Sequence, residues 1–302
     1  MEFLINLVNG LSLGGVYAMI ALGYTMVYGI AKMLNFAHGD IIMVGGYTVY
    51  VFLNLFNPLV ANAPWLAFIS PVVAILASII VCPILGVAVE KTAYKPLRGA
   101  SPLAVLITAI GVSYLLQSLA LIIFGADVKF VIIADLGAIK LDELIIKYNT
   151  IITLVATVAV MVGLTLFVKF TKTGRAMVAV SEDRDAARLM GVNINLIITV
   201  TFAIGSALAA LAGVCSLLET PSLTSTFGAL PGIKAFTAAV IGGIGSIPGA
   251  MVGGLLLGVV ECICNSIPPL APYTMAVEFI ILIVILLVKP SGILGKKRRE
   301  KV

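Results

Sequence analysis

The sequence predicts an all-α polytopic membrane protein with about 8–9 membrane-crossing helices, and two observations support this fold class. Hydrophobic residues make up 61% of the 302-residue chain and charged residues only 11%, whereas a soluble domain needs far less apolar surface. The apolar stretches are also continuous and close to the ~20 residues that one helix needs to cross a bilayer. They lack the period-two alternation of a transmembrane β-barrel.

Apolar segments divide the chain at about residues 4–31, 40–56, 65–89, 103–124, 149–170, 196–218, 232–264 and 273–289. The segment 232–264 is too long for one crossing and is interrupted by Gly242, Gly243, Gly245 and Gly249. We therefore expect a broken helix there, making either two short crossings or one re-entrant hairpin. No polar stretch is long enough for an enzymatic domain, so residues 1–302 are expected to form a single transmembrane domain without catalytic residues.

Lysine and arginine predict the orientation of the chain. All of them fall in loops on one side of the predicted membrane, or in the basic tail at 296–302, except Lys129, Lys140, Lys147 and Lys234. The crowded side is expected to be cytoplasmic, which places the N-terminus outside and the C-terminus inside. The net charge of +5 is dispersed over these loops, so no nucleic-acid partner is expected.

The largest concentration of charge lies in the loop 171–196, TKTGRAMVAVSEDRDAARLMGVNINL. Within it we expect a short helix, because Ser181 suits an N-cap and Gly191 suits a C-terminal stop. Glu182 and Asp183 would place negative charge in the first turn, where the helix dipole favours it. From the residues alone, this loop is either a solvated segment that carries the orientation signal or a helix that docks on a partner.

Two further groups of polar residues interrupt the apolar segments. Asn35, His38 and Asp40 lie between the first two apolar segments. They could form a proton relay. We favour a structural role, in which their side chains bond to free backbone groups and Gly39 permits a turn. Charges at Glu219, Lys234, Glu261 and Glu278 lie near the apolar core. Because isolated charges in lipid are costly, we expect structural pairing of Lys234 with a glutamate rather than a water-lined path.

Small residues and cysteines complete the pattern. Glycines at four-residue spacing let membrane helices approach closely. They recur at Gly10 and Gly14, and again at Gly245, Gly249, Gly253, Gly254 and Gly258. Cys262 and Cys264 form only a weak metal motif without a nearby histidine. We expect the cysteines to pack in the core, with no disulfide, metal or cofactor.

Five stretches resemble the permease subunits of branched-chain amino-acid ABC importers and cover nearly the whole chain in the same order. They are GGVYAMIALGYTMVYGI at 14–30, NFAHGDIIMVGGY at 35–47, EKTAYKPLRGASPLAVLITAIGVSYLLQ at 90–117, GRAMVAVSEDRDAARLMGV at 174–192 and KAFTAAVIGGIGSIPGAMVGGLLLGVVE at 234–261. Without a long N-terminal extension, the chain is most similar to the shorter, LivH-like member of the usual permease pair.

The resemblance implies a fold similar to the vitamin-B12-type importer permease and a set of partners. These are a second permease, two cytoplasmic P-loop ATPases, a solute-binding protein that selects the amino acid, and the surrounding lipid. It also implies that the loop holds the coupling helix that contacts the ATPase, with candidate residues Glu182, Asp183, Arg184, Asp185, Ala186, Ala187, Arg188 and Gly191. The acidic-Ala-Ala motif usual for importers is only loosely kept, because Gly191 follows Asp185-Ala186-Ala187 at a slightly short spacing.

Two alternatives stay open at this stage. One is a stand-alone secondary transporter or channel, in which the helix breaks at 35–40 and 242–249 form a site at the membrane midplane. The other is a permease of the same family for urea or short amides, because selection belongs largely to the binding protein.

Overall fold

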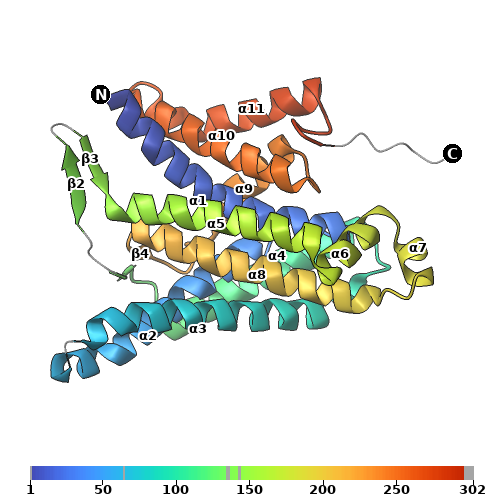
Figure 1. Ribbon diagram of the computed structural model, residues 1–302, viewed down its shortest axis with the longest axis horizontal. Helices are drawn as coiled ribbons and strands as arrows, with labels where there is room; N and C mark the ends of the chain where they lie inside the picture. The colour runs from blue at the N-terminus through green and yellow to red at the C-terminus, as the bar shows by residue number, and fades with distance from the viewer. Residues whose placement is uncertain (1, 64, 134–136, 142–143, 296–302) are drawn as a thin grey trace.

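The structure is a computed structural model that describes residues 2–63, 65–133, 137–141 and 144–295, so the basic tail predicted at 296–302 lies outside the described residues. The chain folds into an elongated bundle of helices (Figure 1). The long helices are α1 (Glu2–Ala31), α2 (His38–Asn62), α3 (Leu66–Val89), α4 (Pro102–Phe124), α5 (Tyr148–Phe170), α8 (Ile194–Glu219), α10 (Ile247–Ser266) and α11 (Thr274–Val288).

Shorter elements connect them. After α3 the helix continues through a π-helical turn, η1 (Glu90–Tyr94), and a 3-10 turn, η2 (Lys95–Leu97); η3 (Ala271–Tyr273) leads into α11. The short helices are α6 (Lys172–Glu182), α7 (Arg184–Leu189) and α9 (Ala229–Gly242). Within the described residues, eight helices are long and apolar enough to cross a membrane, as the sequence predicts.

Four short strands add β structure that the apolar pattern did not predict. Strands β2 (Ala138–Leu141) and β3 (Leu144–Lys147) form an antiparallel hairpin, and β1 (Lys129–Phe130) pairs antiparallel with β4 (Ser222–Leu223). Both pairs lie in connecting segments, and the second joins the chain after α4 to the chain after α8. We call the end of the bundle that carries these strands the hairpin end. We call the opposite end, which carries α6, α7 and the chain after α11, the basic end (Figure 1).

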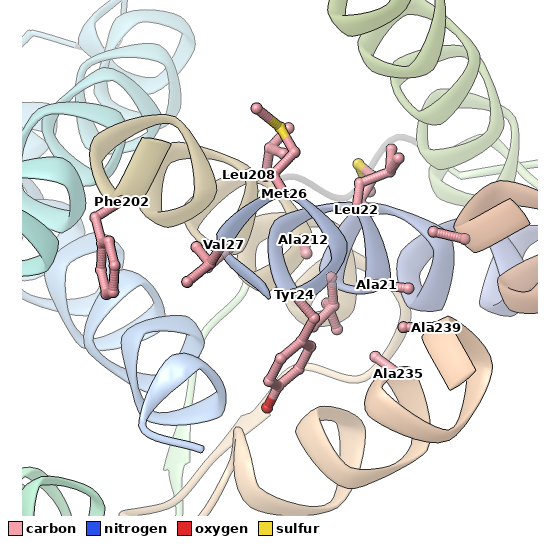
Figure 2. Close-up of a cluster of buried hydrophobic side chains, with 14 of the residues drawn as sticks. Ala21, Leu22, Tyr24, Met26, Val27, Phe202, Leu208, Ala212, Ala235 and Ala239 are labelled. Carbon is pink, nitrogen blue, oxygen red and sulfur yellow. The ribbon is translucent and has the colours of Figure 1, made fainter. Parts of the chain in front are cut away.

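Helix α1 forms the centre of the bundle. In the most apolar stretch of α1, 89% of the helix is buried inside the bundle. The corresponding share is 11% for α4 and for α11, which lie at the periphery. Ala18, Met19 and Ile20 are fully buried in succession, which is possible only where neighbours cover every face of a helix. Figure 2 shows the neighbours that cover α1. Leu208 and Ala212 belong to α8, and Ala235 and Ala239 belong to α9.

The predicted glycine contacts join α1 to α10. A β-carbon on Gly14 would lie 2.8 Å from Leu255 Cα, and one on Gly258 would overlap the backbone of Gly14. Side chains larger than hydrogen therefore cannot be accommodated, and the two helix backbones pack directly on each other, as small residues permit in membrane proteins.

The predicted break in the segment 232–264 separates α9 from α10. The 14 residues of α9 span about 21 Å, less than the ~30 Å of a hydrocarbon core, whereas the 20 residues of α10 suffice. The segment is thus one short helix followed by one full span. Gly242 and Gly249 pack backbone to backbone across the turn, while Gly243 and Gly245 adopt φ of +109° and +95°.

The structure corrects our expectation for Gly245. Among the described residues nothing lies within 4 Å of a β-carbon placed there, so close packing is not the reason for this glycine. Its positive φ is the reason, because residues with a β-carbon rarely adopt that conformation.

Replacing Gly249 with leucine should destabilise the protein by about 3 kcal/mol or more, because the new side chain would have to displace the backbone at Gly242. The matched control is Gly163→Leu in α5, where the described residues leave open space. Thermal unfolding in detergent measures both variants. Equal unfolding temperatures for the two would contradict close packing at the α9–α10 turn.

Candidate functional site

The charged loop folds into two helices instead of the single one expected. Asp183 breaks the chain with extended backbone angles (φ −150°, ψ 112°), ending α6 at Glu182 and starting α7 at Arg184. Its carboxylate accepts hydrogen bonds from the backbone N–H groups of Asp185 and Ala186, both at 3.0 Å. Asp183 is therefore the N-cap of the short helix, and our assignment of Ser181 to that role was wrong.

Ser181 and Glu182 instead belong to the last turn of α6. The Ser181 hydroxyl donates to the carbonyl of Val178 at 2.7 Å, a bond within its own helix. Asp183 outcompetes it as a cap because its own backbone is extended, which aims the carboxylate at the free N–H groups of the next helix.

Gly191 ends α7 as predicted. It has φ of +82°, and its N–H donates to Arg188 O while the N–H of Val192 donates to Ala187 O, both at 3.0 Å. This pair of bonds is a Schellman motif, which satisfies carbonyl groups that the helix leaves free. A capped start and a capped end fix a helix of only six residues, far shorter than would be stable alone.

The side chains of α7 divide into an inner and an outer set. Ala187 is buried at 4% exposure and packs on the bundle, whereas Leu189 and Met190 are 89% and 83% exposed at the basic end. Arg188 and the candidate residues Asp185 and Ala186 are exposed as well. Two large apolar side chains at the tip of a loop, outside the apolar belt of the bundle, are typical of a protein contact site.

Arg184 faces the bundle and not the outer surface. Its guanidinium donates to the carbonyl of Ile30 at 2.8 Å, next to the last residue of α1. Partial burial and the nearby positive charge of Arg98 lower the pKa of Arg184 from its ordinary value. The bond places a positive charge at a helix C-terminus, where the helix dipole is favourable, and it attaches α7 to the central helix.

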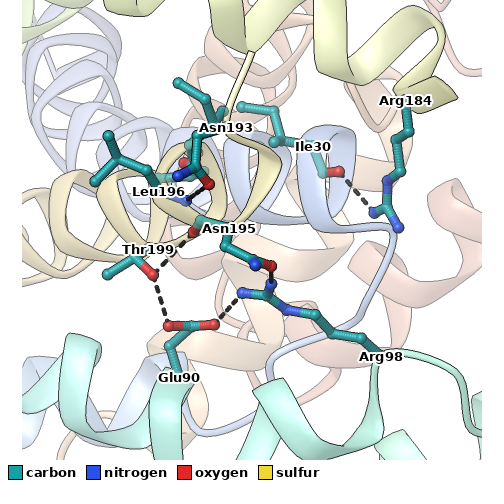
Figure 3. Close-up of polar contacts among 10 residues, drawn as sticks. Ile30, Glu90, Arg98, Arg184, Asn193, Asn195, Leu196 and Thr199 are labelled. Carbon is teal, nitrogen blue, oxygen red and sulfur yellow. Dashed lines mark hydrogen bonds and ion pairs between the residues drawn. The ribbon is translucent and has the colours of Figure 1, made fainter. Parts of the chain in front are cut away.

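A second network at the same end holds the neighbouring helices together (Figure 3). Glu90, fully buried at the end of α3, pairs with Arg98 and accepts a hydrogen bond of 2.9 Å from Thr199 of α8. Arg98 also donates to the side chain of Asn195. This network was not predicted, because Arg98 was interpreted only as part of the orientation signal. The available clue was a glutamate directly after an apolar span, eight residues before an arginine.

The polar cluster at 35–40 is buried and bonded to other helices. Asn35 accepts a 2.7 Å hydrogen bond from Tyr94, and Asp40 accepts one of 2.9 Å from Gln117. His38 packs edge-on against the ring of Tyr24, with centroids 4.7 Å apart. These contacts agree with a structural role, although the partners of Asn35 and Asp40 are mainly side chains and not the backbone we expected.

Gly39 also has a different role from the predicted one. It lies inside α2, and its missing β-carbon permits contact with Gly228 at the start of α9. The start of α2, beside the break at 35–40, therefore meets the start of α9 through a tight backbone contact, whereas the break at 242–249 lies at the other end of α9.

The charges in the C-terminal half are paired. Lys234 of α9 lies 2.6 Å from Glu261 of α10 and 3.3 Å from Glu278 of α11, and Tyr17 of α1 donates to Glu261 at 2.7 Å. One lysine thus links four helices inside the bundle, as the structural interpretation predicted, and Lys234 does not belong to an outer loop. Glu219 is separate, accepting a 2.7 Å bond from Ser12.

The chain after α11 closes the basic end. The N–H groups of Ile293 and Leu294 donate to the carbonyls of Ile241 and Gly242, at 2.8 and 2.9 Å. These carbonyls end α9 and would otherwise lack partners. The helix break at 242–249 is thereby held in place by the segment that follows the last span.

The structure is thus that of a multi-pass helical membrane protein with a capped, exposed helix between two spans. Comparison with known proteins gives the family: residues 6–286 match the family described as branched-chain amino acid transport system, permease component. The chain belongs to this family, so it is a permease component of an amino-acid transport system and not an enzyme.

Individual relatives agree over the full length. The chain is 44% identical to the high-affinity branched-chain amino acid transport system permease protein BraD of Pseudomonas aeruginosa, over 100% of this chain and 98% of the relative. It is 39% identical to the corresponding LivH protein of Escherichia coli, over 99% and 98%. No solved structure matches the chain, so the likeness to the vitamin-B12-type importer fold stays a prediction.

Replacing Lys234 with methionine should cost about 3–5 kcal/mol, because the carboxylates of Glu261 and Glu278 would be left buried without a cation. Thermal unfolding in detergent measures the loss. Lys147→Met, at an exposed lysine of β3, is the control and should change little. Adding Glu278→Gln to Lys234→Met should restore part of the stability, and a further loss would contradict the pairing.

Proposed function

We propose that this chain is the membrane permease subunit of an ATP-binding-cassette importer for branched-chain or other neutral amino acids, with α7 as the element that contacts a cytoplasmic ATPase. The observation that carries the proposal is the combination of a rigidly attached helix and an exposed apolar tip. Arg184 and Ala187 attach α7 to the bundle, while Leu189 and Met190 project from it. A solitary carrier has no need of such a projection.

The orientation follows from the same end of the bundle. The end of α1, the turns η1 and η2, and helices α6 and α7 bring the predicted basic loops together, and the positive-inside rule assigns such an end to the cytoplasm. This orientation puts the N-terminus outside and the segment after α11 on the cytoplasmic side.

Coupling then works through the attachment of α7. When two ATPase subunits close on ATP, a helix held at both its caps and at Ile30 moves as a rigid lever and transmits its displacement to α1. Because α1 contacts most other helices, its displacement shifts the bundle between inward-open and outward-open states. A second permease and a solute-binding protein complete the importer, and the binding protein supplies most of the selectivity.

The relatives favour a branched-chain substrate. BraD and LivH are named as permeases of high-affinity branched-chain amino acid transport, and full-length identity of 44% to BraD supports the same class here over urea or short amides.

The test of the coupling role is Leu189→Glu, which adds a charge to the exposed tip. We expect at least about thirtyfold weaker binding of the ATPase, as for a central interface residue, measured by copurification from the native membrane and by titration of the purified subunits. The thermal stability of the permease should not change, because Leu189 contacts solvent. Val128→Glu, an apolar-to-acid change at an exposed position of the hairpin end, is the control.

Retention of the ATPase by Leu189→Glu at the level of Val128→Glu would reject α7 as the docking element. Uptake that continues without ATP, driven by membrane potential alone, would favour the stand-alone transporter instead. Arg188→Glu tests the outer face of α7 separately from its attachment. Arg184→Glu is less informative about docking, since Arg184 holds α7 to α1.

A further inference from the structure

A cavity of about 530 Å³ opens at the basic end, between the end of α1 and the start of α4. Three basic residues line it, Lys32, Arg98 and Arg184, and most of its other lining residues are apolar, among them Met33, Leu97, Leu103 and Leu106. In Figure 3 Arg184 extends from α7 to the carbonyl of Ile30, whereas Arg98, from the segment before α4, extends to Glu90 and Asn195. None of these contacts explains why three cations share an apolar cavity.

The guanidinium groups of Arg98 and Arg184 each have one N–H donor without a hydrogen-bond partner among the described residues. The Nε–H groups of Arg98 and Arg184 are buried and have no hydrogen-bond partner within the described part of the chain. Buried polar groups in native proteins are nearly always bonded, to protein, water or a ligand. Two such donors on residues that line one cavity therefore indicate an acceptor that the described part of the chain does not provide.

The charge balance indicates that this acceptor is an anion. Glu90 neutralises Arg98, but within the described residues the polar partner of Arg184 is the neutral carbonyl of Ile30, so the positive charge of Arg184 is not neutralised there. The pKa of Arg184 is lowered by burial and by the charge of Arg98, so an anion between the two groups would relieve both effects. A group with several acceptor oxygens, such as a phosphate, suits paired arginines best.

The apolar walls indicate where the anion comes from. Leu103 and Leu106 belong to α4, whose outer face continues away from the cavity as an exposed stripe of Leu103, Ile107, Ile110 and Tyr114. The stripe rises about 16 Å along the helix, comparable with an acyl chain, and the cavity lies where the spans 66–97 and 102–124 end and begin. Soluble anions do not require such a wall.

We propose that this cavity binds the phosphate group of an anionic phospholipid between Arg98 and Arg184, with an acyl chain along the outer face of α4. Basic pockets between membrane helices at the interface bind lipid headgroups in this way. A lipid there would connect α7 to the start of α4 and strengthen the attachment of α7 to α1. The site depends on the cavity alone and is independent of what drives transport.

The test uses the purified full-length protein in neutral detergent, stripped of native lipid. Unfolding is followed with a thiol-reactive dye, because the free cysteines Cys82, Cys215 and Cys264 are buried in the folded chain. Dioleoylphosphatidylglycerol should raise the unfolding temperature by about 5 °C at saturation. Dioleoylphosphatidylcholine at the same mole fraction, which has the same chains but no net charge, should raise it by much less.

Substitutions assign the effect to the cavity. Arg184→Gln should abolish the difference between the two lipids, whereas Arg188→Gln, on the same helix but exposed and outside the cavity, should retain it. Ala100→Trp fills the cavity from its rim and keeps both arginines, so it should also abolish the difference even if Arg184→Gln fails to fold. Arg98→Gln is avoided, because it would leave Glu90 buried without its partner.

Three results would overturn the proposal. They are equal stabilisation by both lipids, a phosphatidylglycerol effect that survives both Arg184→Gln and Ala100→Trp, and stabilisation by millimolar inorganic phosphate equal to that by phosphatidylglycerol. The last would show an anion site for soluble phosphate and not for lipid.

Discussion

The direct backbone contact between α1 and α10 is the constraint on which the rest of the structure depends. In lipid no hydrophobic driving force favours helix association, so close packing and polar contacts must supply it. Gly14 and Gly258 bring the two helices together without intervening side chains, and α1 is then enclosed by α8, α9 and α5 as well. A central helix enclosed in this way receives every displacement of its neighbours, which is why attachment at its end matters for function.

The charged groups inside the described bundle bond across helices. Lys234 connects α9 to α10 and α11, Glu90 connects α3 to α8 through Arg98 and Thr199, and Asp40 connects α2 to α4. Because a buried charge without a partner is costly in a membrane, these bonds select one arrangement of helices that would otherwise pack through similar apolar faces.

At the basic end, one helix is both firmly attached and exposed. The caps of α7, the bond from Arg184 to Ile30 and the burial of Ala187 restrict its motion relative to α1, while its apolar tip is free to meet a partner. The neighbouring cavity contains the unused donors of Arg98 and Arg184. On the two proposals made for this end, a bound lipid and a docked partner would act on the same short helix.

The sequence by itself determined the fold class, the approximate number of spans, the break at 242–249, the presence of a short helix ending at Gly191 and the family, because hydropathy, glycine punctuation and motif order are local properties of the chain. It did not determine the cap, since Ser181 and Asp183 are both good caps and only the backbone path decides between them. Nor could the sequence show that Arg184 points toward the bundle or that Gly39 contacts another helix, because the partners of both residues are distant along the chain. The same holds for the bonds that join the Glu90–Arg98 pair to α8. These depend on which helix faces meet, and that is decided only when α1 is enclosed by its neighbours in the tertiary structure.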